Sequence, residues 1–220
     1  MQIDNVVCTD FTINQLLQKQ EIAAFMEQDG YVFVGGFAYG DILGSGVATT
    51  LIIKNQLNDI FTPIFADEKK FVLGVCNGCQ ILVKLGLFGD KVDICENLSK
   101  KFESRWLPVN WNDQMIGIWV AHGEGRFDFK PGWDDDSTGD ANQIFGTYIS
   151  ADYPLNPNGS MLDAIGIRNG RGNHIALMPH PERSVFKWQC EYIPAELAAS
   201  YEGPYTPWID FFQQLIEKVM

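Results

Sequence analysis

Short apolar runs that end in glycine-rich turns dominate the hydrophobic pattern of the first part of the chain. Tyr31–Gly36 has four aromatic or β-branched residues followed by two glycines, and Phe71–Val75 is a second run of this kind. Continuous apolar runs of this length are typical of strands buried on both faces. Each run leads through a turn into a helical pattern, over Val47–Asn55 and over Gln80–Leu85, where Gly86 ends the helix. This order predicts an α/β fold with a doubly wound, mostly parallel sheet flanked by helices.

The middle of the chain adds strand patterns of a different kind, which alternate or lie close together. A glycine-rich turn at 169–173 between two apolar runs is a strong hairpin signal, so additional antiparallel strands are expected. The predicted strands are Phe102–Trp111, Ile116–Ala121, Ile144–Ile149, Ala164–Arg168 and His174–Met178.

The C-terminal segment has the pattern of an amphipathic helix. Thr206 is a suitable N-cap, and Pro207 suits the first helical position. The apolar positions that follow have helical spacing, which indicates core packing; they are Trp208, Phe211, Phe212, Leu215, Ile216 and Val219.

Composition narrows the class of protein. The 220 residues suit one domain over residues 1–220, and 16 Lys and Arg against 28 Asp and Glu give a net charge of −12, which argues against nucleic acid and anionic membranes as partners. The acidic stretch 128–140 lacks the ligand pattern of a calcium loop and is expected to be a solvated surface loop. Five cysteines without disulfide spacing, no signal peptide and no membrane span predict a cytoplasmic protein.

The segment Gly74–Gly78 reads Gly-Val-Cys-Asn-Gly, the pattern of a nucleophile flanked by small residues at a strand-to-helix turn. A helix N-terminus should lower the pKa of the Cys76 thiol, and the Asn77 N–H could bind a developing oxyanion. Cys76 and Cys79 also form a C-x-x-C pair, so a redox dithiol, half of a zinc site or simply buried cysteines remain alternatives. The other cysteines are isolated, which disfavours zinc.

A cysteine nucleophile needs a base, and the chain has three histidines. His180 lies between two prolines, which should exclude a helix and keep the segment extended, so that His180 and Glu182 face the same site. Glu182 would then orient the imidazole. We expect His174, at a strand start, to be structural or solvated, whereas His122 lies in a loop of a kind that often lines ligand sites.

Two of these motifs together, Gly74–Gln80 and Met178–Arg183, closely resemble the class I (triad) glutamine amidotransferases, which have a flavodoxin-like fold. Further motifs resemble the glutaminase part of phosphoribosylformylglycinamidine synthase, and two of them its C-terminal domain in the large, fused form. These further motifs are Gly35–Asp41, Phe102–Arg105, Ala121–Arg126, Asn156–Ser160 and Thr206–Ile209. The resemblance covers roughly residues 30 to 212.

The resemblance implies a set of catalytic roles. Cys76 attacks the side-chain amide of L-glutamine, His180 transfers the proton, and Glu182 orients His180. A γ-glutamyl thioester forms and is hydrolysed to glutamate. The oxyanion would be held by the backbone N–H groups of Gly36 and Asn77.

The resemblance also implies which residues contact the substrate and where the ammonia goes. Gln80 would contact glutamine, and the loop at His122 and Gly123 would close on it. The ammonia would pass to a synthase domain, of the same polypeptide or a partner chain, that uses ATP and Mg²⁺ to convert formylglycinamide ribonucleotide to the amidine in purine biosynthesis. The sequence has no phosphate-binding loop and no metal motif, so no cofactor is expected in this chain.

One departure from the family pattern concerns the N-terminus. The segment Asp4–Asp10 is similar to the second strand of the family, so the first strand and helix are expected to be missing. A vacant position in the sheet would expose unpaired backbone groups. The missing strand favours a non-catalytic docking remnant as an alternative function. A γ-glutamyl hydrolase or cysteine peptidase of the same fold, which would share the turn at the nucleophile, is a further alternative.

Overall fold

The computed structural model describes residues 6–133 and 141–218, and in these residues seven strands form one mixed sheet. Its order is β1-β2-β9-β8-β7-β4-β5, with β1–β2 and β2–β9 parallel and the remaining neighbours antiparallel. The bounds are β1 Gly30–Phe33, β2 Phe71–Val75, β4 Glu103–Trp111, β5 Gln114–His122, β7 Gln143–Tyr148, β8 Ala164–Arg168 and β9 His174–Leu177. A second sheet pairs β3 (Val92–Cys95) with β6 (Arg126–Phe129).

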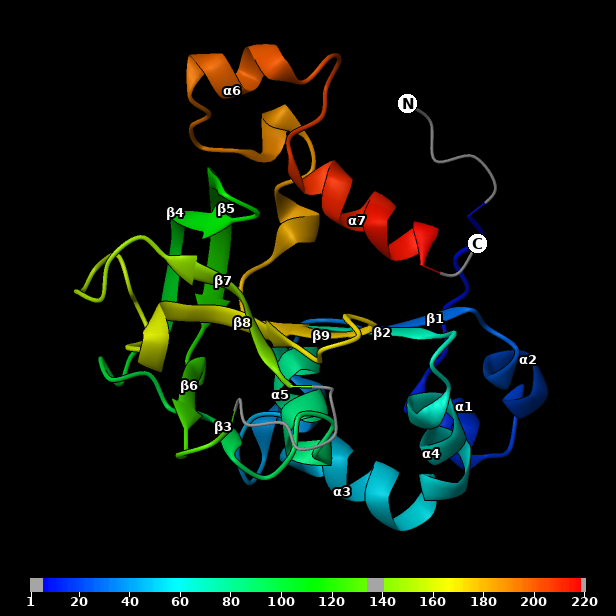
Figure 1. Cartoon of the computed structure of the whole chain (residues 1–220). Coiled ribbons are helices and arrows are strands. Elements are labelled where there is room, and N and C mark those ends of the chain that lie inside the picture. Colours follow the sequence, from blue (N-terminus) through cyan, green and yellow to red (C-terminus); the bar gives the residue numbers. More distant parts are fainter. Residues whose placement is uncertain (1–5, 134–140, 219–220) are drawn as a thin grey trace.

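Helices cover both faces of the central strands (Figure 1). One layer lies below the sheet in that view, and α7 lies above it. The lower layer comprises α1 Ile13–Leu17, α2 Ile22–Met26, α3 Val47–Gln56, α4 Asn58–Ala66 and α5 Asn77–Leu85; α6 is Ala195–Ser200 and α7 is Trp208–Glu217. The predicted α/β class with additional antiparallel strands is confirmed, and its parallel part consists of β1, β2 and β9.

Two apolar clusters hold these layers together. The larger joins the sheet to α5 on one face and to α7 on the other, where Trp208 stacks on Trp111 with ring centroids 5.2 Å apart. The smaller packs α1 to α4 against β1 through edge-to-face aromatic rings, with Phe25 touching both Tyr31 and Phe61. Burial of a large apolar side chain contributes about 1.5–3 kcal/mol, so these clusters fix the position of the turn after β2.

The predicted strands and the hairpin of β8 and β9 agree with the structure to within one or two residues. Helix α7 begins at Trp208, later than Pro207, but the Thr206 hydroxyl still accepts a hydrogen bond from the Trp208 N–H at 3.2 Å. Helix α4 was not predicted, since it contains Pro63, which usually ends a helix. The short elements α1, α2, α6 and β3 also escaped prediction.

The described part of the N-terminal segment, residues 6–10, does not form the strand expected over Asp4–Asp10. Residues 6–10 have no regular structure, and residues 1–5 lie outside the described residues. β1, β2 and β9 are direct neighbours, so the parallel part of the described sheet has no internal gap. In the described chain, β1 forms one edge of the sheet.

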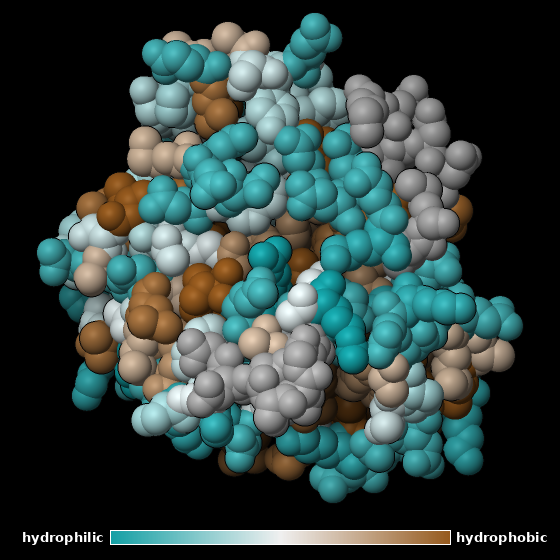
Figure 2. Space-filling view, viewed as in Figure 1, coloured by the Kyte–Doolittle hydropathy of each residue, from teal (hydrophilic) through white to brown (hydrophobic). Residues whose placement is uncertain are grey.

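The face in Figure 2 is largely hydrophilic, and apolar side chains appear on it as separate spots. In the described part of the chain, no helix has the length and apolar character needed to cross a membrane. Asp128 of the acidic stretch belongs to strand β6, contrary to the expected loop, while residues 134–140, with four of its aspartates, lie outside the described residues.

Candidate active site

Cys76 occupies a sharp turn between β2 and α5, at the carboxyl end of the parallel strands. Its backbone has φ 53° and ψ −106°, a conformation that a residue other than glycine rarely adopts. The flanking glycines make this turn possible because a Cβ on Gly78 would lie 1.9 Å from the Phe33 carbonyl oxygen, and one on Gly74 would lie 2.7 Å from the Gly78 backbone. Any larger residue would push α5 away from β1 and β2.

His180 and Glu182 follow strand β9, the parallel neighbour of β2. His180 is 1% exposed, its N–H donates to the Trp119 carbonyl at 2.8 Å, and its Nδ1 lies 2.6 Å from Glu182 Oε1. The predicted contact is present, but its expected cause was wrong. Pro181–Arg183 forms a 3₁₀ turn with Pro181 at its first position, where the missing N–H of proline costs nothing.

Gly35, in the turn after β1, lies between the cysteine and the histidine. A Cβ on Gly35 would lie 3.3 Å from Cys76 Cβ and 2.9 Å from His180 Cε1. Both side chains therefore lie next to the space that is open because residue 35 has no side chain. The Cys76 thiol donates to the Ala121 carbonyl at 3.5 Å, and no described residue hydrogen-bonds to His180 Nε2. The structure therefore brings Cys76, His180 and Glu182 together at one end of the sheet.

The electrostatics of Cys76 differ from the prediction. Burial raises the pKa of the thiol to about 11, and this effect outweighs the Asn77 backbone N–H and the Arg183 cation, which both lower it. The expected net lowering by the helix N-terminus was therefore wrong. Burial also raises the pKa of Cys79 well above its ordinary value, which disfavours a pair of readily ionised thiols.

A cavity of about 310 Å³ opens beside Cys76. It is lined by Gly36, Phe37, Asp41, Ser45, Cys76, Gln80, Glu96, Lys100, Lys101, Phe102, Ala121, His122, Gly123 and Glu124. Five of the predicted site residues thus line one pocket, whereas Asn77, His180 and Glu182 are not part of its lining. A larger hollow of about 420 Å³, which includes His174, contains none of Cys76, His180 and Glu182.

The predicted substrate contacts form two walls of this cavity. Gln80 is held at both ends of its amide: it accepts from Asn77 Nδ2 at 3.0 Å and donates to the Glu124 carbonyl at 2.5 Å. His122 is buried, no described residue hydrogen-bonds to its ring nitrogens, and burial lowers its pKa to about 4, so the imidazole is neutral at pH 7.

Two carboxylates in the cavity were not singled out from the sequence. Glu124 accepts from the Ser45 N–H at 3.1 Å, and Asp41 lies within 3.5 Å of Asn77 Nδ2. Burial and, to a lesser extent, Glu124 raise the pKa of Asp41. The sequence signals were their place in glycine-rich loops and within the motifs Gly35–Asp41 and Ala121–Arg126, which resemble the family.

The alternative of a zinc site has no support in the structure. All five cysteines are free, and Cys8, Cys95 and Cys190 are not close to Cys76 and Cys79 in any metal-like arrangement among residues 6–133 and 141–218. In these ranges, no group of three or more His, Cys, Asp or Glu side chains could hold a metal ion.

Comparisons with known proteins fit this arrangement. The family model of the CobB/CobQ-like glutamine amidotransferase domain matches residues 1–217. A phosphoribosylformylglycinamidine synthase of Drosophila melanogaster is 34% identical, over 90% of this chain and 17% of the fly protein. The phosphoribosylformylglycinamidine synthase subunit PurQ of Methanococcus maripaludis is 37% identical, over 70% of this chain and 65% of that subunit.

A solved structure is also similar. That of PurLQS from Thermotoga maritima matches with a TM-score of 0.65 and 25% identity, over 88% of this chain and 81% of that chain. The chain spans less than a fifth of the length of the fly synthase and 65% of the Methanococcus subunit.

Proposed function

The chain belongs to the CobB/CobQ-like glutamine amidotransferase domain family, and we propose that it hydrolyses L-glutamine to glutamate and ammonia with Cys76 as the nucleophile. The resemblance to glutamine amidotransferases of purine biosynthesis, inferred from the motifs, is confirmed by the relatives. The proposal rests on the proximity of Cys76 and His180 at Gly35, on the contact of His180 with Glu182, and on the cavity that Cys76 itself lines. Residues 1–220 form one glutaminase domain in this proposal.

The reaction begins with transfer of the thiol proton. Because the pKa of Cys76 is raised to about 11, little thiolate exists at neutral pH, and His180 Nε2 removes the proton as sulfur adds to the amide carbon. Glu182, on Nδ1, fixes the tautomer that leaves Nε2 free to accept the proton and stabilises the cation that forms. Catalytic hydrogen bonds are often completed only when substrate is bound, which fits the present direction of the thiol toward Ala121.

The tetrahedral oxyanion would be bound by the N–H groups of Gly36 and Asn77. The Asn77 N–H faces Cys76 at the start of α5, and Gly36 lines the cavity with φ +145°, a conformation that favours glycine. Collapse of this intermediate expels ammonia, which takes the proton from His180 and leaves a γ-glutamyl thioester. Water then attacks the thioester with His180 as base, and releases glutamate and the free thiol.

The charges around the cavity fit an amino acid. Its volume, about 310 Å³, is at the small end of the range of ligand pockets. Asp41 and Glu124 could hold an ammonium group, and Lys100 and Lys101 could hold a carboxylate. Gln80 and the His122–Gly123 loop complete the walls around the substrate.

We propose that the ammonia is used by a synthase domain of the same polypeptide or of a partner chain. This domain would convert formylglycinamide ribonucleotide to formylglycinamidine ribonucleotide with ATP, in de novo purine biosynthesis, as the names of the relatives suggest. ATP and Mg²⁺ would bind on the synthase part. The exposed rings of Phe37 and Phe102, 6.0 Å apart at the pocket, offer an apolar contact for such a domain.

The five free cysteines suit the reducing conditions of the cytoplasm, which is the proposed location.

Glutamate release, measured with and without the synthase, tests the function. The synthase supplied with ATP and formylglycinamide ribonucleotide should form the amidine from glutamine only when this chain is added. Replacement of glutamine by ammonium chloride should remove the need for the chain, and Cys76→Ala should support only the ammonia reaction. Equal amidine formation by Cys76→Ala and wild type with glutamine would favour a non-catalytic docking role. Glutamine-independent cleavage of γ-glutamyl peptides would favour the hydrolase alternative.

A further inference from the structure

The motif Asn156–Ser160 has no role in the reaction as described, yet it lies directly behind the substrate pocket. The loop His122–Gly125, which joins β5 to β6, forms one wall of that pocket. Its Glu124 carbonyl accepts from Gln80 Nε2, and its Glu124 carboxylate accepts from the Ser45 N–H. The position of this loop therefore determines where the groups around the substrate lie.

Asn97 binds both ends of the loop and does not itself line the cavity. Its Nδ2 donates to the His122 carbonyl at 2.8 Å, and its Oδ1 accepts from the Gly125 N–H at 3.0 Å. Its backbone N–H donates to the Gly123 carbonyl at 2.9 Å. The same Nδ2 also donates to the Lys101 carbonyl at 2.9 Å, in another segment that lines the pocket. One side chain, 1% exposed, thus joins two walls of the pocket.

Asn158 supports the loop next to Asn97. Its Nδ2 donates to the Gly125 carbonyl at 2.7 Å, and its own carbonyl accepts from the Leu98 N–H at 3.0 Å. Asn158 is fully buried, so these bonds are shielded from water.

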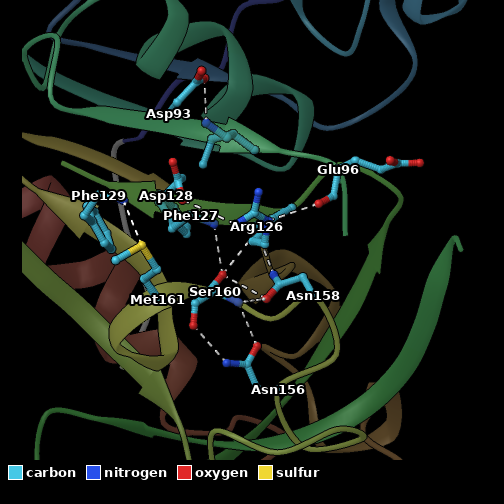
Figure 3. Close-up of polar contacts among 12 residues, drawn as sticks. Asp93, Glu96, Arg126, Phe127, Asp128, Phe129, Asn156, Asn158, Ser160 and Met161 are labelled. Carbon is cyan, nitrogen blue, oxygen red and sulfur yellow. Dashed lines mark hydrogen bonds and ion pairs between the residues drawn. The ribbon is translucent and has the colours of Figure 1, made fainter. Parts of the chain in front are cut away.

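Ser160 and Asn156 keep Asn158 in place, as Figure 3 shows. The Ser160 hydroxyl donates to Asn158 Oδ1 at 2.8 Å and accepts from the Phe127 N–H at 3.1 Å. Asn156 Oδ1 accepts from the Ser160 N–H at 3.1 Å, and its Nδ2 donates to the Ser160 carbonyl at 3.0 Å. We call Asn97, Asn156, Asn158 and Ser160 the amide clamp.

The chemistry of the clamp requires amides. Asn97 and Asn158 each donate to backbone carbonyls through Nδ2 and accept from N–H or O–H groups through Oδ1. A carboxylate of the same shape accepts but cannot donate, so it would repel the carbonyl oxygens at this buried position. We propose that Asn97 and Asn158 are positioning residues for the glutaminase reaction, which hold the His122–Gly125 loop in the geometry that binds glutamine. This inference rests on the proposed function.

The test compares Asn97→Ala and Asn158→Ala with Asn169→Ala. Asn169 is a matched control, because it is also a buried amide with hydrogen bonds at both ends, to Asn173 and to the His174 N–H, and it lies at the opposite end of the sheet from Cys76. Ser160→Ala removes only a hydroxyl and serves as a milder variant if an asparagine variant does not fold. Thermal unfolding verifies that each variant is folded.

Two readouts separate positioning from general stability. The KM for glutamine should rise about tenfold in Asn97→Ala and Asn158→Ala, as expected for a lost pair of buried hydrogen bonds. Iodoacetamide does not depend on the contacts that bind glutamine, so it should alkylate Cys76 in both variants at the wild-type rate. Amide hydrogen exchange at residues 122–127 should be about tenfold faster than in Asn169→Ala. Asn97→Asp should not rescue either property.

An unchanged KM, together with exchange at residues 122–127 equal to that of Asn169→Ala, would overturn the positioning role. A fall in the rate of Cys76 alkylation as large as the rise in KM would also overturn the positioning role, because the variants would then disturb Cys76 itself. A wild-type protein without glutaminase activity would contradict the proposed function instead, and the exchange measurement would still decide whether the clamp holds the loop.

Discussion

The substitution Gly35→Ala should displace His180 without removing any of the catalytic side chains. The new Cβ would lie 2.9 Å from His180 Cε1, whereas ordinary van der Waals contact begins near 3.4 Å, so the imidazole or the turn must retreat by about 0.5 Å. The ring is buried and its Nδ1 is held by Glu182, so it cannot rotate freely. Gly35 does not have a positive φ, so alanine adds no backbone strain at this position.

The expected effect is a fall in kcat. A misplacement of about 1 Å between reacting groups can cost about a hundredfold, or about 2.7 kcal/mol, and half that shift should cost about tenfold or more. We expect kcat for glutamate release to fall tenfold to a hundredfold, with a Tm within a few degrees of wild type. Val34→Ala is the control, because Val34 is the preceding residue, is 72% exposed and does not line the pocket. A Gly35→Ala enzyme with the kcat of Val34→Ala would refute the proposed contact between Cys76 and His180.

Further predictions concern the turn and its ionisable groups. Gly78→Ala should destabilise the fold by several kcal/mol, seen as a lower urea midpoint, because its Cβ would lie 1.9 Å from the Phe33 carbonyl oxygen. Cys76→Ala should abolish glutamate release while Cys79→Ala retains it; equal losses would revive the dithiol alternative. Iodoacetamide should alkylate Cys76 about tenfold faster per pH unit up to pH about 11, and a plateau near pH 9 would contradict the raised pKa. The free energy of unfolding should decrease as pH falls from about 6.5 to about 4, because unfolded His122 binds a proton that the folded protein, with a pKa of about 4, does not; a His122→Gln variant should lose this slope.

The sequence could predict the turn at Cys76 because its requirements are local. A buried strand, two glycines and a following helix are all visible within about a dozen residues of sequence. The structure adds the reason for Gly78, which touches the Phe33 carbonyl of another strand. That contact depends on how β1 and β2 pair, so no local pattern contains it.

Other features needed the tertiary structure. His180 is the N-cap of the 3₁₀ turn Pro181–Arg183 and not part of an extended chain, so its contact with Glu182 was predicted for the wrong reason. The direction of the Cys76 pKa depends on burial, which the surrounding elements create. Asn97 and Asn158 lie far apart in the sequence, and nothing near either residue indicates that both bind the same loop.

Cys76 should attack the side-chain amide carbon of glutamine and of its analogues. The most direct test treats the folded protein with 6-diazo-5-oxo-norleucine, a reactive glutamine analogue, and measures the intact mass and the labelled peptide. We expect one adduct per chain, located on Cys76, slowed by excess glutamine and absent from Cys76→Ala. A folded wild-type protein that gains no adduct, or gains it on another cysteine, would contradict the role of Cys76 as the nucleophile.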